Sequence, residues 1–389
     1  MTGVPLVDSG RSRPHTPGVT TLRGGRLVAD TDLELAEIHF ERGLISETAG
    51  DTEVIDVDGL IVAPGLIDIQ INGAFGHDFT HDPTTIWEVG ERLPELGVTS
   101  FVPTVVTSPG EVTDLAIEVV AHRRPDHYRG AAVLGLHFEG PWISPEMNGA
   151  HNLGHIVAPD ADVARRWVGS GMVRIVTLAP ELPDADVVAQ ILHDGGVVVS
   201  LGHSTAGYDT ARRALAGPVS LVTHLFNQMT PFGHRDPGAV GAALVSDRHS
   251  ALVADGIHVA PATLAVAWVA LGSDRTILVS DAMAALGLGP GVYAFGAGPI
   301  TVGDEGPRTA EDRLAGSVLT LPQAAMNLAT WTSASLVESL HCVSRNPARL
   351  LGLTDRGALD TGRRADLALL NDRFEVIMTF VGGRMRSKR

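Results

Sequence analysis

Short apolar runs recur along the middle of the chain, and most are followed by an amphipathic stretch of helical length. Continuous apolar strands that alternate with helices predict a parallel sheet buried on both faces. The eight runs are Leu66–Ile71, Thr99–Val106, Ala132–Phe138, Val173–Leu178, Val197–Leu201, Leu221–Phe226, Ser250–Ala254 and Thr276–Val279. The helical stretches are Thr85–Leu96, Asp160–Val168, Asp184–His193, Tyr208–Ala216 and Ala262–Leu271.

Eight such units predict that the sheet closes into a (β/α)8 barrel. The competing architecture is a doubly wound open sheet, but no Gly-x-Gly-x-x-Gly turn follows the first strand. After the eighth strand, Thr301–Leu314 predicts a polar hairpin. Leu321–Leu340 then predicts a long helix, and Asn346–Leu351 a short one.

Both ends of the chain are rich in short strands broken by turns, unlike the middle. Near the start these are Thr20–Leu22, Leu27–Ala29, Leu33–Phe40, Glu53–Val57 and Leu60–Val62; near the end they are Ala365–Leu370 and Phe374–Val381. Chain ends often lie close together in a domain. The pattern therefore predicts a small β-sandwich domain from residues 19–63 and 356–389, flanking a barrel of residues 64–355. Residues 1–18 are polar, without the apolar core of a signal peptide, and predict a flexible N-terminus.

Composition narrows the class of protein. Hydrophobic residues make up 44% and charged residues 19% of the 389, a profile typical of a soluble globular protein. The single cysteine, Cys342, excludes an intramolecular disulfide and a multi-cysteine metal site, and it fits a reducing cytoplasm. The net charge is −16, and the only basic cluster is the Arg384–Arg389 tail, so nucleic-acid binding is not expected. An anionic substrate would need a local cationic patch.

Polar side chains stand where six of the eight predicted strands end. In barrel enzymes the carboxyl ends of the strands carry the active site. A single buried His or Asp is more often a structural group, but six on one rim indicate a site. The segments are Gln70-Ile71-Asn72-Gly73, His137-Phe138-Glu139-Gly140, Gly202-His203-Ser204, Thr223-His224-Leu225-Phe226-Asn227, Asp255-Gly256-Ile257-His258 and Ser280-Asp281-Ala282.

Glu139, His203 and His224 form a candidate first shell for a divalent cation. Three His and carboxylate ligands with one open position are typical of catalytic zinc. A bound Zn²⁺ lowers the pKa of its water from about 15.7 to about 7, which produces a nucleophile at neutral pH. Asp281 is the candidate for moving protons to an amide leaving group, and His258 for polarising the carbonyl oxygen. The structural alternative for Asp281 is a helix N-cap ahead of Ala282–Leu286, and for His258 a purely structural role.

These segments together resemble the N-acetylglucosamine-6-phosphate deacetylases of the amidohydrolase superfamily. The resemblance runs from about residue 20 to the end of the chain, and the motifs are specific in combination. The matching motifs include Pro64-Gly65-Leu66-Ile67-Asp68, His137-Phe138-Glu139-Gly140-Pro141-Trp142, Gly149-Ala150-His151, Arg235-Asp236-Pro237-Gly238 and Leu314-Ala315-Gly316-Ser317, beside the strand ends already described.

The resemblance implies hydrolysis of the acetamide of N-acetyl-D-glucosamine 6-phosphate to D-glucosamine 6-phosphate and acetate. It makes Glu139, His203 and His224 the metal ligands, Asp281 the general base and acid, and His258 the contact to the carbonyl oxygen.

The resemblance also implies the residues that bind the sugar phosphate. His151 is similar to a histidine that holds a sugar hydroxyl, and Asn227 and its neighbour Gln228 match substrate-binding positions near the phosphate. Arg235 matches a phosphate-binding arginine that reaches the site from the neighbouring subunit, which implies a homodimer. A guanidinium group suits a phosphate because its fork pairs two oxygens at once.

The sequence departs from the wider superfamily at the end of the first strand. Many members carry His-x-His there for a second metal, whereas this chain has Gln70-Ile71-Asn72, a form that some deacetylases of the family share. Neutral amides are poor transition-metal ligands. We therefore expect one metal ion per subunit, with Zn²⁺ ahead of Fe²⁺, Mn²⁺ or Co²⁺, and with Gln70 and Asn72 near the metal's water. His77, which lies beyond a Gly-rich loop, is the candidate for a substitute ligand.

Two other readings of the sequence remain open. The same scaffold could deacetylate the galactosamine epimer or an unphosphorylated amide. A catalytically inactive sugar-phosphate sensor is the alternative from another class of protein, and it is disfavoured because every ligand and acid–base position is filled.

Overall fold

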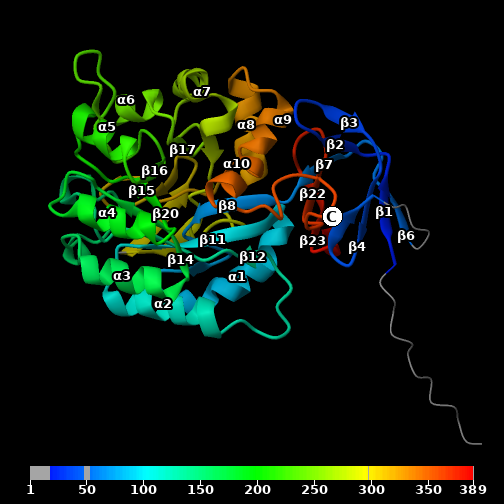
Figure 1. Cartoon of the computed structure of the whole chain (residues 1–389), viewed down its shortest axis with the longest axis horizontal. Coiled ribbons are helices and arrows are strands. Elements are labelled where there is room, and N and C mark those ends of the chain that lie inside the picture. Colours follow the sequence, from blue (N-terminus) through cyan, green and yellow to red (C-terminus); the bar gives the residue numbers. More distant parts are fainter. Residues whose placement is uncertain (1–17, 48–52, 297, 389) are drawn as a thin grey trace, which may run out of the picture.

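Eight parallel strands form a barrel that dominates the fold, shown on the left of Figure 1. The computed structural model describes residues 18–47, 53–296 and 298–388. Each barrel strand is hydrogen-bonded to the next, and a bridge between Ile71 and Ala282 joins the last strand to the first. The predicted barrel is confirmed. Its strands are β8 (Leu66–Ile71), β11 (Val98–Val106), β13 (Leu136–Glu139), β14 (Val173–Leu178), β15 (Val198–Leu201), β16 (Val219–Val222), β17 (His249–Leu252) and β18 (Thr276–Leu278).

Helices surround the barrel because their apolar faces cover the outer faces of its strands (Figure 1). Tyr208–Ala216 was predicted with the right bounds, since it is amphipathic and flanked by glycines. Gly238–Val245 was not predicted: all but its last residue are buried, so it shows no helical alternation. The helices are α1 (Ile86–Arg92), α2 (Gly110–His122), α3 (Ala161–Ser170), α4 (Ala185–Asp194), α5 (Tyr208–Ala216), α6 (Gly238–Val245) and α7 (Pro261–Arg275).

Three shorter helices close the barrel after β18: α8 (Leu321–Trp331), α9 (Leu336–His341) and α10 (Arg345–Leu350). The single helix predicted over residues 321–340 is therefore broken. Thr332 leaves helical geometry, and Ser335 begins a new helix through a capping box with Glu338.

Two small sheets from the chain ends pack on one side of the barrel, on the right in Figure 1. They share an apolar core that includes Leu22, Phe40, Leu369 and Phe380. One sheet has the order β5 (Leu44–Ser46), β4 (Ile38–Glu41), β1 (Thr20–Arg23), β6 (Glu53–Asp56). The other has the order β24 (Arg384–Lys388), β23 (Val376–Val381), β22 (Leu367–Leu370), β7 (Ile61–Pro64), β2 (Arg26–Val28), β3 (Leu33–Leu35).

The predicted strand over residues 33–40 is in fact two strands, β3 and β4, which lie in different sheets. The predicted flexible N-terminus lies outside the described residues except for Gly18. The domain boundaries near residues 63 and 356 stay a prediction.

A single residue, Gly65, separates β7 of the six-stranded sheet from β8 of the barrel. Its backbone N–H donates to the Asp366 carbonyl over 2.7 Å. A side chain here would place its Cβ 2.1 Å from Thr99 Oγ1, so only glycine fits between the sheet and the barrel. The two parts of the fold are thus joined without a linker.

An antiparallel excursion follows β18, made of β19 (Gly291–Phe295), β20 (Gly298–Gly303) and β21 (Gly306–Arg308). It begins earlier than the hairpin predicted over residues 301–314. Its own apolar cluster joins Phe295 and Ile300 to Met283, just beyond the last barrel strand. Within the described part of the chain, no helix has the length and apolar character needed to cross a membrane.

Candidate metal centre and active site

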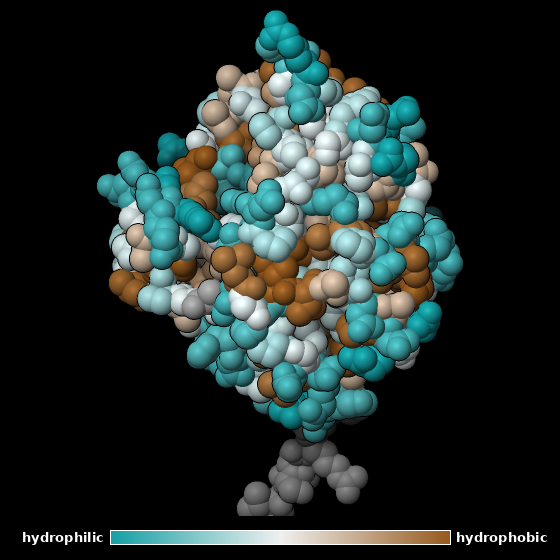
Figure 2. All heavy atoms as spheres, turned by 90° about the vertical axis from the view of Figure 1, so that its left-hand side faces the viewer, coloured by the Kyte–Doolittle hydropathy of each residue, from teal (hydrophilic) through white to brown (hydrophobic). Residues whose placement is uncertain are grey.

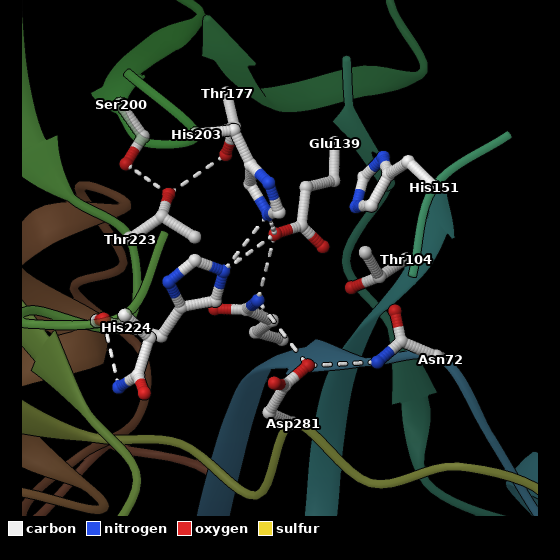
Figure 3. A network of polar contacts seen from close by, with 12 residues as sticks. Asn72, Thr104, Glu139, His151, Thr177, Ser200, His203, Thr223, His224 and Asp281 are labelled. Carbon is white, nitrogen blue, oxygen red and sulfur yellow. Dashed lines mark hydrogen bonds and ion pairs between the residues drawn. The ribbon is translucent and has the colours of Figure 1, made fainter. Parts of the chain in front are cut away.

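Three predicted ligands meet at the carboxyl end of the barrel (Figure 3). Glu139 is the last residue of β13, and His203 and His224 stand just beyond β15 and β16. Glu139 Oε1 lies 3.1 Å from His203 Nε2 and 2.9 Å from His224 Nε2, and the two Nε2 atoms are 3.1 Å apart. All three side chains are buried. A carboxylate and two imidazoles that converge in this way match the donor set of catalytic zinc.

The hydrogen bonds around these groups fit a cation. The His203 Nδ1 atom lies 2.7 Å from the Met147 carbonyl, to which it donates, so Nε2 presents its lone pair to the site. Burial opposes ionisation of Glu139, but the contacts with the rings of His203 and His224 hold its pKa well below the usual range. Burial likewise opposes a charged His224, yet the Glu139 carboxylate raises its pKa. The Glu139 carboxylate is therefore held in the ionised form that a metal ligand requires.

The backbone at the strand ends adopts an uncommon conformation. His203, His224 and Asp281 have φ angles of 49°, 27° and 48°, in the left-handed region. Such residues cost about 1–3 kcal/mol each and cluster at active sites, where surrounding structure holds them. Here the turn directs three neighbouring side chains into the barrel mouth.

Asp281 is held by the two amide side chains at the end of β8. Its Oδ1 accepts hydrogen bonds from Asn72 Nδ2 over 2.8 Å and from Gln70 Nε2 over 3.3 Å, and Gln70 Nε2 also lies 3.3 Å from Glu139 Oε1. Burial, followed by the charge of Glu139, raises the pKa of Asp281 to about 6. The alternative of a helix N-cap is wrong, because turns rather than a helix follow Asp281.

His258 is paired with Asp255, a residue to which the sequence analysis assigned no role. Asp255 Oδ2 lies 2.6 Å from His258 Nδ1, and Asp255 Oδ1 accepts from the backbone N–H groups of Ile257 and His258 over 2.8 and 2.7 Å. Burial opposes ionisation, but the hydrogen bond with His258 lowers the pKa of Asp255. The Asp-Gly-Ile-His spacing could have predicted these contacts, since an Asp side chain commonly accepts hydrogen bonds from the backbone N–H groups two or three residues further along the chain.

A cavity of about 300 Å³ opens over the three candidate ligands. Its wall includes most of the residues predicted from the sequence: Glu139, His151, His203, His224, Asn227, Gln228, His258 and Asp281. Arg308 and Arg313, from the segment that follows β20, also line it and were not predicted. Arg313 Nη1 donates to Asn148 Oδ1 over 3.1 Å, and Arg308 pairs with Asp312 over 3.3 Å.

Four predicted residues do not line this cavity, and two of them, Gln70 and Asn72, instead contact its lining residues Glu139 and Asp281. Arg235 is on an exposed loop, where its Nη1 contacts His234 Nε2 over 2.7 Å. His77, in β10 (His77–Asp78), lies with its Nε2 3.3 Å from Glu88 Oε1 rather than beside the candidate ligands.

His151 is the competitor for a place among the ligands. Its ring nitrogens lie within 4.8 Å of ligand atoms of Glu139 and His203, as a metal site requires. The separations of 2.9–3.1 Å among Glu139, His203 and His224 are shorter and favour that set. His151 instead contacts Thr107 Oγ1 through Nδ1 over 2.8 Å.

Buried polar side chains lie beside the ligands, among them Thr177, Ser200 and Thr223 (Figure 3). His137 Nε2 lies 2.8 Å from Thr177 Oγ1, which lies 2.8 Å from Thr223 Oγ1, and that atom is 2.5 Å from Ser200 Oγ. Burial lowers the pKa of His137 to about 4, so its ring is neutral. His137 precedes Glu139 by two residues in β13 and therefore faces the same interior. The sequence signal was this period of two.

Comparison with known proteins places these features in context. The family model described as "Amidohydrolase family" matches residues 61–386. The N-acetylglucosamine-6-phosphate deacetylase of Bos taurus is 39% identical over 381 residues, covering 94% of this chain and 90% of its own. That of Bacillus subtilis (strain 168) is 36% identical, covering 83% of this chain and 84% of its own.

Solved structures agree with the sequence comparisons. The N-acetylglucosamine-6-phosphate deacetylase of Pasteurella multocida superposes with a TM-score of 0.88 at 30% identity, covering 94% of this chain and 99% of its own. A mutant of the Mycobacterium smegmatis enzyme in complex with N-acetyl-D-glucosamine-6-phosphate superposes with a TM-score of 0.87 at 28% identity, covering 96% of this chain and 100% of its own.

Proposed function

The chain belongs to the amidohydrolase family, a metal-dependent family, and from this premise we propose that it deacetylates N-acetyl-D-glucosamine 6-phosphate. The products are D-glucosamine 6-phosphate and acetate. The relatives from Bos taurus and Bacillus subtilis carry this activity in their names, and one structural relative binds this sugar phosphate. The observation that carries the proposal is the meeting of Glu139, His203, His224 and Asp281 in one cavity.

One divalent cation per subunit, Zn²⁺ before Fe²⁺, Mn²⁺ or Co²⁺, would be held by Glu139, His203 and His224. When bound, it supplies Lewis-acid activation of the water that attacks the amide. Gln70 and Asn72 are not ligands of a second metal ion. Their side-chain N–H groups are committed to the carboxylates of Glu139 and Asp281, which holds both acceptors in place.

Asp281 takes the proton from the attacking water and passes it to the amide nitrogen, which leaves as a neutral amine. A pKa of about 6 suits both halves of this transfer near neutral pH, because the group can be ionised first and protonated later. His258 directs Nε2 towards the carbonyl oxygen, since its Nδ1 is occupied by Asp255. His151, which also lines the cavity, holds a sugar hydroxyl.

The phosphate would be bound by Asn227, Gln228 and an arginine. Asn227 and Gln228 line the cavity, whereas Arg235 does not, which supports a homodimer in which Arg235 serves the partner's site. Phe232, on the same loop, is 60% exposed, an unusual state for an aromatic side chain unless another surface covers it.

The loop's position also supports self-association. Strand β8 begins after Gly65, next to the six-stranded sheet. The carboxyl ends of the barrel strands therefore lie on the side of the barrel that faces away from the small sheets. Figure 2 shows that side, and apolar side chains form a band across it. A second copy of the chain would cover such a band. A cytoplasmic location is part of the proposal and rests on the single cysteine, Cys342, which is buried and free.

Acetate release from a panel of N-acetyl sugars tests the function. Metal-assayed protein should act on N-acetylglucosamine 6-phosphate with a higher kcat/KM than on the galactosamine epimer or the unphosphorylated sugar. A preference for either alternative would replace the proposed substrate. A metal-loaded protein that binds the sugar phosphate without releasing acetate would instead be a sensor.

A further inference from the structure

A second cavity, of about 420 Å³, lies between the barrel and the six-stranded sheet and is lined by five arginines. Two come from the segment after α2, Arg124 and Arg129, and three from the C-terminal region, Arg364, Arg384 and Arg386. The cavity also touches β12 (Ala132–Val133), beside the small sheets in Figure 1 and so at the amino-terminal end of the barrel strands. It is therefore remote from the barrel mouth.

Most of this positive charge is not neutralised within the described chain. Arg364 pairs with Asp366 over 2.7 Å. The side chains of Arg124, Arg129, Arg384 and Arg386 form no ion pair with any described carboxylate.

Hydrogen bonding leaves the same groups available. Arg129 Nη1 donates only to backbone carbonyls, those of Asp126 and Tyr128. Arg386 Nε is buried and has no hydrogen-bond partner among the described residues. Glu91, whose charge acts on Arg386, uses its Oε2 to accept from the backbone N–H groups of Arg129 and Gly130, each over 2.9 Å. Donors thus remain on the cavity side without acceptors.

Arg386 is half-buried, whereas Arg124, Arg129 and Arg384 are exposed, so the cost of leaving the site without an anion falls on Arg386. Burial, together with the charges of Arg384 and Arg129, lowers the pKa of Arg386, while Glu91 opposes the shift. The whole chain carries a net charge of −16, so local concentration of cations here runs against its overall charge. An unpaired buried donor adds its own desolvation cost. A bound anion would remove both penalties.

We propose that this arginine cavity binds a diphosphate or triphosphate group, as carried by a nucleotide or by inorganic polyphosphate. Guanidinium forks pair two phosphate oxygens each, and one terminal phosphate presents only three. Four unpaired arginines therefore match a chain of two or three phosphates better than a single one. The cavity volume falls in the range of small-molecule sites. This site is separate from the barrel mouth, and it does not rest on the deacetylase activity.

Calorimetric titration of the full chain, with glucosamine 6-phosphate present to occupy the mouth, tests the proposal. The probes are ATP, pyrophosphate and AMP, with sodium sulfate as a control at matched ionic strength. We expect one equivalent of ATP or pyrophosphate to bind at least about tenfold more tightly than AMP or sulfate. Equal affinity for ATP and pyrophosphate identifies the phosphate chain as the ligand, and tighter ATP binding identifies a nucleotide.

Arg384→Ala and Arg386→Ala should each weaken this binding at least about tenfold. Arg212→Ala, an exposed arginine on α5, should leave it unchanged. Unaltered deacetylation without added ATP would show that each variant is folded. Wild-type affinity in both cavity variants, or equal affinity for AMP, overturns the proposal. So does a short single-stranded RNA that binds at the cavity more tightly than ATP, because the surface would then be a nucleic-acid site.

Discussion

The Asp255 carboxylate lies 2.6 Å from Nδ1 of His258, on a turn that places both residues at the end of one barrel strand. Nδ1 carries the proton of this hydrogen bond, so Nε2 is the ring atom left for the substrate, and it can donate to a carbonyl oxygen only when it carries a second proton. The Asp255 carboxylate orients the ring and balances the positive charge of that doubly protonated form.

Asp255→Asn should therefore lower kcat by about 10²-fold or more, with a much smaller change in KM, since the neutral amide cannot balance the charge of a ring that donates through Nε2. Steady-state kinetics with metal-matched protein measures this. The exposed Asp247→Asn is the control for loss of one acidic charge. A variant with wild-type kcat would mean that His258 orientation does not depend on Asp255.

Asp281→Asn should reduce turnover by about 10²–10⁴-fold while metal content is kept, because proton transfer is lost and the ligands remain. In the wild type, kcat/KM should fall as pH drops below about 6, since burial and the charge of Glu139 raise the pKa of Asp281 to about 6 and protonation removes the base. A pH–rate profile from pH 4.5 to 8 measures this fall in kcat/KM. A profile flat through pH 5 would assign the base to another group.

Two ligand sets can be separated by metal analysis. His224→Ala should lose the metal together with activity, whereas His151→Ala should keep about one equivalent and lose activity through a higher KM. Elemental analysis of dialysed protein provides the measurement. Re-addition of Zn²⁺ after chelation should restore the activity of the wild-type protein. Retention of metal by His224→Ala with its loss from His151→Ala would favour the alternative set of Glu139, His151 and His203. Two equivalents in active wild type would contradict a single metal.

Arg235 can be tested by mixing two variants that are impaired in different ways. Arg235→Ala should raise KM for the phosphorylated sugar, and Asp281→Asn should reduce turnover by about 10²–10⁴-fold. If Arg235 acts across a dimer interface, a mixed dimer has one site with a native Asp281 and a native Arg235 from the other chain. Co-refolded protein should then regain about a quarter of wild-type activity at subsaturating substrate, since half of the dimers are mixed and each has one complete site. No recovery in verified mixed dimers would show that Arg235 acts within its own chain.

The buried carboxyl group of Asp68 should make the free energy of unfolding depend on pH. Burial raises its pKa to about 7, so the folded protein holds this proton more tightly than the unfolded chain does. Its stabilising contribution is complete below the unfolded pKa of about 4 and is lost as pH rises through about 7, an effect on the order of 4 kcal/mol. Asp68→Asn should gain stability relative to wild type between pH 5 and pH 8. If the thermal midpoints of the variant and the wild type differed by the same amount at pH 5 and at pH 8, the raised pKa of Asp68 would be contradicted.

The barrel could be predicted because its strands are apolar on both faces and its outer helices are mostly amphipathic. What the pattern missed has local causes. Apolar residues surround α6, so no period marks it as a helix. The break after Trp331 depends on a capping box between Ser335 and Glu338 inside an otherwise helical pattern.

In the candidate site too, some features could be predicted from the sequence and others depend on the folded structure. The identities of Glu139, His203 and His224 follow from strand ends, but their aim depends on left-handed turns at His203 and His224 that no periodicity encodes. Arg308 and Arg313 reach the cavity from an excursion whose fold over the mouth is a tertiary feature. Neither residue follows a predicted barrel strand.

Gly65 has a consequence for how the molecule can move. Since β7 and β8 are one nearly continuous strand, the six-stranded sheet cannot swing as a hinged domain relative to the barrel without breaking the pairing of both. Gln70 and Asn72 lie at the far end of that strand, so the catalytic rim is anchored to the sheet made by the two chain ends. Entry of substrate must therefore be accommodated by the loops and the β19–β21 excursion, and heat should unfold sheet and barrel in a single cooperative step.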